Sequence, residues 1–168
     1  MSLLCLKLKK LKLKFYKYQG AGNDFVMIDD REKTFPISTE LINRLCDRNF
    51  GIGADGLILL QNDENSDFRM VYFNSDGNES TMCGNGGRCI IRFANDLDVA
   101  NDKMTFNAID GLHHGIVDQE VIRLQMIDVN EVEDHDKYLF MNTGSPHHVE
   151  FVENVKDINV YKKGKAIR

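Results

Sequence analysis

The residues best suited to chemistry form one polar stretch, from Asn74 to Cys89, in which Cys83 is followed by Gly-Asn-Gly-Gly. A helical pattern begins directly after Cys83. Unpaired backbone N–H groups and the positive end of the helix dipole meet at such a helix start, where they favour the thiolate form of a cysteine. The glycines leave room for an anion against the same N–H groups. The stretch therefore predicts a base beside a carboxylate cradle, which removal of a proton next to a carboxylate requires.

The other cysteines lack this setting. Cys46 belongs to an apolar helical stripe, so we expect it to pack in the core. Cys89 falls six positions after Cys83, on a different side of the helix, and we expect it to face inward. With four cysteines and no secretion signal in the sequence, a reducing cytoplasm is the expected compartment.

No metal site is expected. The cysteines form no C-x-x-C pair. Two adjacent histidine pairs, His113-His114 and His147-His148, would point to opposite sides of a strand, so neither pair can chelate one ion. All five histidines are expected to be structural or solvent-facing.

Two glycine-rich turns allow alternative interpretations. Gly51-Ile-Gly-Ala-Asp-Gly56 matches the dinucleotide pattern G-x-G-x-x-G, but that pattern needs a strand before it and a helix after it. Here a helix is expected first and a strand second, which favours a tight connector. The turn Gly20-Ala-Gly-Asn-Asp24 is either an ordinary hairpin or a binding loop in which Asn23 offers an amide donor and acceptor. Asn74, in turn, either caps its loop or binds a ligand.

The spacing of apolar residues predicts a mixed α/β chain. Ser38 is a plausible N-cap for a helix that ends near Arg48, and a second, more strongly amphipathic helix follows Cys83. This second helix is expected to be central and buried. Short, mostly antiparallel strands are expected at 15–18, 25–28, 57–60, 68–73, 105–109, 112–117, 121–127, 138–142 and 147–152, with a charged link at 131–137.

Composition excludes several classes of protein. The chain has 168 residues, 42% of them hydrophobic, and a net charge of -5, which argues against nucleic acid as a partner. No apolar run approaches the ~18 residues of a membrane span. Leucine and lysine nearly alternate from Leu6 to Lys14, and residues 1–14 are expected to be an N-terminal extension.

Five motifs in order resemble the diaminopimelate epimerase family. They are Tyr18-Gln-Gly-Ala-Gly-Asn-Asp-Phe25, Arg48-Asn-Phe-Gly-Ile-Gly-Ala-Asp-Gly56, Asn74-Ser-Asp-Gly77, Met82-Cys-Gly-Asn-Gly-Gly-Arg-Cys89 and Thr143-Gly-Ser-Pro-His147. The resemblance implies an α/β fold of two similar halves, each with a curved, mostly antiparallel sheet around a central helix. It also implies a cofactor-independent enzyme of lysine biosynthesis, commonly dimeric, that interconverts LL- and meso-diaminopimelate.

The resemblance also implies roles for individual residues. Cys83 corresponds to one of two acid/base cysteines, and Gly84 and Asn85 to donors that hold the α-carboxylate. The substrate-binding side chains correspond to Asn23, Asn74 and Ser145. Ser145 stands where many relatives have asparagine, and its shorter hydroxyl offers one donor.

One departure from the family pattern is an absence. The second half of the family carries a Glu-Arg pair and a second cysteine in Ala-Cys-Gly-Thr-Gly, and neither occurs in these 168 residues. We therefore expect an extension (1–14), an N-terminal epimerase domain (15–128) and the beginning of a second, incomplete domain (129–168), inactive alone. Two alternatives remain open: another cofactor-independent racemase, such as a proline racemase-like enzyme, and a non-catalytic amino-acid-binding fragment.

Overall fold

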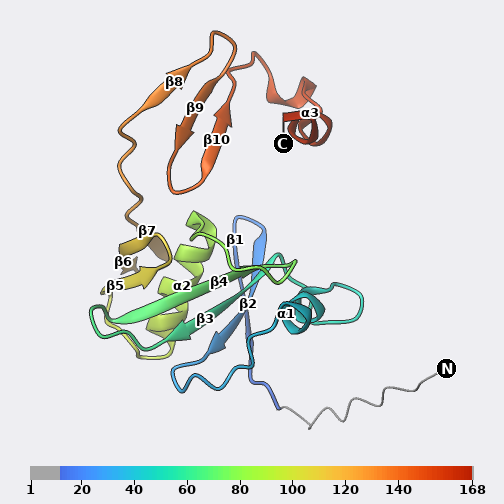
Figure 1. Ribbon diagram of the computed structural model, residues 1–168. Helices are drawn as coiled ribbons and strands as arrows, with labels where there is room; N and C mark the ends of the chain where they lie inside the picture. Colours follow the sequence, from blue (N-terminus) through green and yellow to red (C-terminus); the bar gives the residue numbers. More distant parts are fainter. Residues whose placement is uncertain (1–11, 168) are drawn as a thin grey trace, which may run out of the picture. The chain divides into compact units, whose positions relative to one another are not determined.

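The structure is a computed structural model that describes residues 12–167 (Figure 1). The chain divides into two compact units, the first ending at Met126 and the second beginning at Ile127. We call them unit 1 and unit 2. Cys5 and most of the predicted extension at 1–14 lie outside the described residues.

Unit 1 is built on one seven-stranded sheet in which the strands follow one another in chain order. Four of the six pairings are antiparallel, whereas β2–β3 and β4–β5 are parallel, so the predicted mostly antiparallel sheet is confirmed. The strands are β1 (Tyr16–Gly20), β2 (Asn23–Asp29), β3 (Gly56–Gln61), β4 (Phe68–Asn74), β5 (Lys103–Ala108), β6 (Gly111–Asp118) and β7 (Val121–Leu124), and the helices are α1 (Thr39–Cys46) and α2 (Gly84–Asp96).

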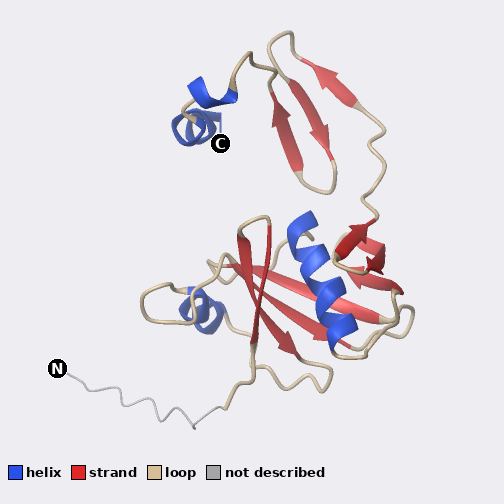
Figure 2. Cartoon of the chain, turned by 180° about the vertical axis from the view of Figure 1, so that it is seen from behind, coloured by secondary structure: helices blue, strands red, loops and turns tan. Residues whose placement is uncertain are grey.

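The sheet curves around α2 on one face and carries α1 on the other (Figures 1 and 2). Alternate residues of the inner strands point to opposite faces. Phe25 and Ile58 join the core around α2, while Val26 and Leu57 join a second core around α1. Burial on both faces explains why β2, β3 and β4 are nearly continuous apolar runs.

Helix α2 is the buried central helix that the sequence predicts. Cys89, Ile90, Phe93 and Ala94 are all buried in the core. Ile91 is buried as well, although it lies outside the apolar stripe that the sequence pattern assigned to the core. Its side chain lies so close to Gly115 of β6 that a Cβ there would be 2.6 Å away, so the curved sheet covers more than one side of the helix.

Helix α1 begins where the sequence predicts and ends earlier. The Ser38 hydroxyl accepts the Leu41 N–H at 3.2 Å, which confirms the predicted N-cap. The helix stops at Cys46 rather than near Arg48. The Asp47 carboxylate accepts the N–H groups of Asn49 and Phe50 at 2.7 and 2.6 Å, and these bonds turn the chain out of the helix.

The segment from Gly51 to Gly56 is a connector between α1 and β3, as the order of elements predicts. It folds back on the carboxyl end of α1, where Ile52 N–H donates to the Leu45 carbonyl at 2.8 Å. A Cβ at Gly51 would lie 1.9 Å from the Arg44 carbonyl oxygen, so this glycine is needed for close packing. A phosphate would meet carbonyl oxygens here, and the dinucleotide interpretation is therefore wrong.

Unit 2 contains an antiparallel sheet in the order β10-β9-β8, followed by a short 3-10 helix and α3. Its strands are β8 (Val132–Asp134), β9 (Leu139–Asn142) and β10 (Pro146–Val149), and its helical segments are η1 (Val155–Asp157) and α3 (Val160–Ile167). Strand β8 replaces part of the predicted charged link, and α3 was not predicted. None of the described helices is long and apolar enough to cross a membrane.

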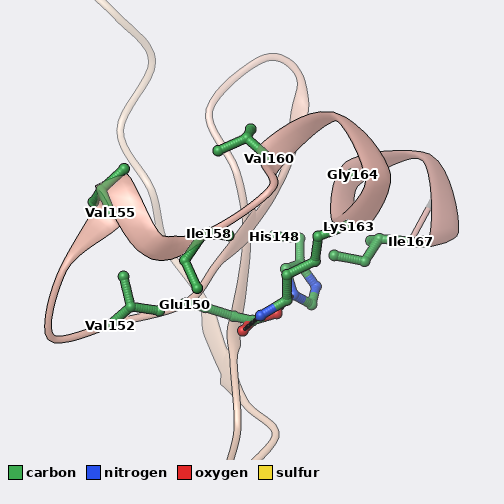
Figure 3. A pocket seen from close by; sticks show the side chains of 9 residues that line it. All are labelled: His148, Glu150, Val152, Val155, Ile158, Val160, Lys163, Gly164 and Ile167. Carbon is green, nitrogen blue, oxygen red and sulfur yellow. Dashed lines mark hydrogen bonds and ion pairs between the residues drawn. The ribbon is translucent and has the colours of Figure 1, made fainter.

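A small apolar hollow of unit 2 surrounds one carboxylate (Figure 3). Glu150 accepts hydrogen bonds from His148, at 2.8 Å, and from Lys163 of α3. The Lys163 ammonium and then His148 hold the pKa of Glu150 below its usual range. Valine and isoleucine side chains form the walls, so the ion pairs tie α3 to β10 across an otherwise apolar gap.

Candidate active site

Cys83 is the N-cap residue of α2, and its sulfur accepts the Gly86 N–H at 3.2 Å. The side chain is half-buried. The predicted core positions of Cys46 and Cys89 are confirmed, because both are buried and burial raises the pKa of each thiol to about 11. Among the cysteines of residues 12–167, Cys83 alone is both accessible and placed at a helix start.

The first turn of α2 has backbone donors to spare. Gly86 N–H donates to the thiol, and Gly87 N–H donates to the Cys83 carbonyl at 2.8 Å. The N–H groups of Gly84 and Asn85 donate to no atom of the described chain. The first turn also holds no acidic side chain. Two free donors at the positive end of a thirteen-residue helix thus lie beside the sulfur, and their role in holding a carboxylate stays a prediction.

Strand register brings two further predicted residues to the end of the strands that lies near the start of α2. Asn23 pairs with Gly20, and the β1–β2 turn lies against the helix, because a Cβ at Gly20 would be 3.2 Å from the Asn85 carbonyl. Asn74 pairs with Gly56, which also pairs with β2. Residues Asn23, Gly56 and Asn74 therefore end their strands at one rim of unit 1.

The same residues also share a face. Side chains two positions apart on a strand point the same way. Asn23 is therefore on the same face of the sheet as Phe25, and Asn74 on the same face as Tyr72. Both aromatic residues belong to the core around α2. Cys83 packs against the edge of this core. The rim thus gathers a thiol, two carboxamides and free N–H groups.

The carboxamides of the rim differ in their partners. Asn74 Oδ1 accepts the Tyr72 hydroxyl at 2.8 Å, and Asn85 Oδ1 accepts a guanidinium N–H of Arg88. The Asn23 side chain has no hydrogen bond to any other described residue. The hairpin interpretation of its turn is confirmed, since Ala21 and Gly22 have φ of 53° and 85°, as a two-residue hairpin turn requires.

Sequence reasoning missed Tyr72 and Arg88. Tyr72 stands two positions before Asn74 on a predicted strand, which is a sign that the two side chains share a face. The pKa of Tyr72 is raised to about 12, by burial first and then by an electrostatic contribution from nearby Cys83. Its hydroxyl therefore stays protonated, and able to donate, at neutral pH.

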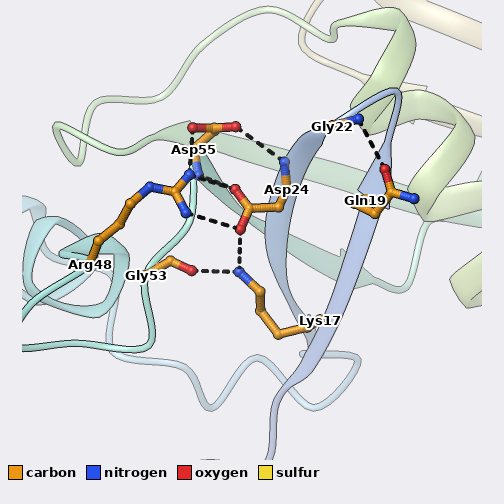
Figure 4. Close-up of polar contacts among 7 residues, drawn as sticks. All are labelled: Lys17, Gln19, Gly22, Asp24, Arg48, Gly53 and Asp55. Carbon is orange, nitrogen blue, oxygen red and sulfur yellow. Dashed lines mark hydrogen bonds and ion pairs between the residues drawn. The ribbon is translucent and has the colours of Figure 1, made fainter.

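A cluster of charges fixes the hairpin that carries Asn23 (Figure 4). Arg48 Nη2 lies 2.7 Å from Asp24 Oδ1 and 2.8 Å from Asp55 Oδ1. Lys17 Nζ lies 2.8 Å from Asp24 Oδ2. The Arg48 guanidinium, and then the Lys17 ammonium, hold the pKa of Asp24 well below its usual range. The cluster joins β1, β2 and the α1–β3 connector beside the rim.

Asp24→Asn is expected to lower the free energy of unfolding at pH 7 by about 1–2 kcal/mol, because it removes a multiply bonded carboxylate. A carboxyl whose folded pKa is depressed stabilises the fold above its unfolded pKa, roughly 3.9, and this stabilisation is lost as pH falls toward the folded pKa. The deficit of the variant should therefore shrink below about pH 4. Urea unfolding at pH 7, 5 and 3 measures it.

Glu32→Gln removes one exposed carboxylate and is the control. Its unfolding free energy should differ little from that of the unchanged chain at each pH. A constant deficit for Asp24→Asn from pH 7 to pH 3 would contradict the assigned ion pairs, since an uncharged role of the side chain has no such pH dependence.

The other residues that the sequence analysis singled out include Ser145 and the histidines. Ser145 belongs to unit 2, in the turn between β9 and β10, where its carbonyl accepts the Thr143 N–H at 3.1 Å. Its contact with a substrate stays a prediction. His113 is buried beside Asp110, with Nε2 3.3 Å from Oδ1. The described residues contain no cluster of three or more potential metal ligands.

Several solved structures share this fold. A Bacillus anthracis phenazine biosynthesis protein of the PhzF family matches 84% of this chain and 55% of its own, with a TM-score of 0.62 and 16% identity. A probable proline racemase from Agrobacterium radiobacter matches 91% of this chain and 57% of its own, with a TM-score of 0.60 and 12% identity. A hydroxyproline epimerase from Agrobacterium vitis matches 81% and 50%, with a TM-score of 0.59 and 11% identity. At these identities the likeness establishes the fold, a curved sheet around a central helix.

Sequence comparison is more specific. The family model for diaminopimelate epimerase matches residues 15–126, and the chain belongs to that family. The diaminopimelate epimerase of Flavobacterium psychrophilum is 60% identical over 158 residues, which cover 93% of this chain and 62% of the relative. The Aquifex aeolicus enzyme is 38% identical and shares 93% of this chain and 63% of its own. The chain thus spans somewhat less than two thirds of the relatives that it matches.

Proposed function

We propose that this chain supplies one half of a diaminopimelate epimerase site, with Cys83 as one of its two acid/base groups. The observation that carries the proposal is the start of α2, where a half-buried thiol adjoins the unpaired N–H groups of Gly84 and Asn85. A substrate α-carboxylate bound to these N–H groups would place its α-carbon near the sulfur. Asn23 and Asn74 would bind other polar groups of the substrate from the same rim.

The reaction inverts one tetrahedral carbon by exchanging a proton. Cys83, as thiolate, removes the α-proton or, as thiol, returns one from the same face, while a second thiol acts on the opposite face. No cofactor takes part in this proposal, so the negative charge that develops on the carboxylate must be stabilised by the protein. The free N–H groups and the positive end of α2 are fixed donors for that charge.

Two alternatives use the same rim. A proline racemase-like activity shares the fold, but the family match and the relatives favour diaminopimelate. A non-catalytic fragment that only binds amino acids would need the donors and not the thiolate. Protection of Cys83 by a panel of amino acids distinguishes the proline racemase-like alternative from the proposal. The alkylation rate of Cys83 distinguishes the non-catalytic fragment from it.

Alkylation of the 168-residue chain tests the proposal directly. With iodoacetamide near neutral pH, the Cys83 peptide should be modified at least about tenfold faster than the peptides of Cys46 and Cys89, since thiolate is the reacting form and burial suppresses it. Peptide mapping by mass spectrometry reports each cysteine separately. Diaminopimelate should slow the modification of Cys83, whereas lysine, which lacks the second carboxylate, should protect less.

Three results would count against the proposal. Equal modification of the three cysteines would show that the start of α2 does not activate its thiol. Rapid modification of Cys83 without protection by diaminopimelate would leave a reactive thiol but remove the substrate assignment. Better protection by proline than by diaminopimelate would favour the proline racemase-like alternative.

A further inference from the structure

The Tyr72 hydroxyl determines which end of the Asn74 carboxamide faces the rim. Tyr72 is 8% exposed, and its ring packs edge-on against Phe25 with the centroids 5.9 Å apart. A Cβ at the neighbouring Gly56 would lie 2.6 Å from the same ring. The hydroxyl therefore has a fixed position, from which it donates to Asn74 Oδ1 at 2.8 Å.

A hydrogen bond to the carboxamide oxygen fixes the side-chain orientation, because the oxygen is held beside its donor and the NH₂ group is the end left free for a ligand. Asn85 repeats this arrangement, because its Oδ1 accepts from Arg88, and a guanidinium is always a donor. The acceptor oxygens of two side chains of the rim are thus already hydrogen-bonded within unit 1. Together with the free N–H groups of Gly84 and Asn85, these two carboxamides present donors to a ligand, whereas Asn23 keeps both a donor and an acceptor free.

We propose that Tyr72 is a positioning residue, which holds Asn74 so that it donates to a carboxylate of the substrate rather than accepting from an ammonium group. This inference rests on the proposed function and adds the polarity of one contact to it. Without the hydroxyl, the carboxamide can rotate by half a turn and offer either end. Binding of a dicarboxylate should then weaken although no group that touches it has been removed.

Tyr72→Phe removes the hydroxyl and keeps the ring. The readout is the diaminopimelate concentration that halves the rate of Cys83 alkylation in the 168-residue chain. Tyr72→Phe should raise this concentration about five- to tenfold, the value of one ordinary hydrogen bond, and Asn74→Ala at least about tenfold. In the double variant the effect of Tyr72→Phe should vanish, because the hydroxyl acts only through Asn74.

Tyr18→Phe is the matched control. It also removes one tyrosine hydroxyl from unit 1, but that hydroxyl bonds to Asp96 at 2.5 Å, at the far end of α2. The half-protecting concentration should stay within about twofold of the unchanged chain. Asn74→Asp provides a second measure: it keeps an acceptor for Tyr72 and lacks a donor, so it should weaken binding at least as much as Asn74→Ala. Thermal unfolding checks the fold of every variant, and Tyr72→Phe should lower Tm by only about 2–4 °C.

The outcomes separate the inference from the function on which it rests. If Asn74→Ala weakens protection and Tyr72→Phe does not, the positioning role is wrong and the proposed function survives. Multiplying effects in the double variant would also refute it, since they would mean that Tyr72 acts independently of Asn74. If diaminopimelate fails to protect the unchanged chain, the substrate assignment fails and the inference with it.

Discussion

Cys83→Ser is expected to lower kcat for epimerisation by about 10²–10⁴-fold or more in a protein that carries both acid/base thiols. A serine hydroxyl fits the same N-cap position and can accept the same Gly86 N–H, so the fold and the anion site should persist. The hydroxyl is a much weaker acid than a thiol and is hardly ever ionised near neutral pH. Proton removal should therefore fail while the substrate still binds.

A chimera provides the complete site for this measurement. It joins this chain to the remaining part of the Flavobacterium psychrophilum relative, which is 60% identical to it over 158 residues. The unmodified chimera sets the reference rate for the conversion of LL- to meso-diaminopimelate. KM of the variant should stay within a few-fold of the reference, because the groups that bind the substrate are unchanged.

Cys89→Ala is the control for loss of a thiol from the same helix. Cys89 is buried, so the substitution leaves a small cavity and should destabilise the fold by about 1 kcal/mol without a large change in kcat. If Cys83→Ser keeps more than about a tenth of the reference kcat, the acid/base role of Cys83 is wrong, since removal of a general acid/base group costs at least about 10²-fold.

Local sequence patterns predicted the parts of the fold that local forces determine. Ser38 could be recognised as an N-cap from its own chemistry and its place before an apolar stripe. The buried face of α2 followed from the 3.6-residue period of Cys89, Ile90 and Phe93. Cys83 was identified from a glycine-rich helix start alone, and the structure places it there.

The missed elements lack such patterns. Strand β8 has three exposed residues, Val132 to Asp134, and is formed by backbone pairing with β9. Its charged, exposed side chains give no sequence pattern that predicts this pairing. Helix α3 contains Gly164, which weakens a helical pattern. One sign of α3 was available, because Asn159 caps it by accepting the Lys162 N–H at 2.9 Å.

Long-range contacts account for what the sequence could not reveal about the site. Asn23 and Asn74 lie at one rim because β2 pairs in parallel with β3. Parallel strands are joined by a long crossover connection, so their pairing is not visible in the local sequence. The link from Arg48 to Asp24 spans 24 residues for the same reason. The hydrogen bond between Tyr72 and Asn74 is local in the sequence. Its relevance to the candidate site follows only from the tertiary structure, which places Asn74 near the start of α2.

The 168-residue chain alone is expected to leave the α-proton of LL-diaminopimelate in place. Inversion needs a second acid/base group on the face opposite Cys83. The other cysteines of residues 12–167 cannot act so, because Cys46 and Cys89 are buried with thiol pKa values of about 11. Charge on the carboxylate would also meet the donors of only one helix start, that of α2, which leaves the carbanion poorly stabilised.

Incubation in D₂O followed by proton NMR tests this expectation, with the unmodified chimera as the positive control. The chimera should lose the α-proton signal and form the meso isomer, while the chain alone should do neither. Loss of the signal without formation of the meso isomer would show that Cys83 and its donors suffice to remove the proton and return deuterium to the same face. Formation of the meso isomer by the chain alone would mean that an acid on the opposite face is supplied by this chain or a second copy of it, and the expectation that the chain is inactive alone would be wrong.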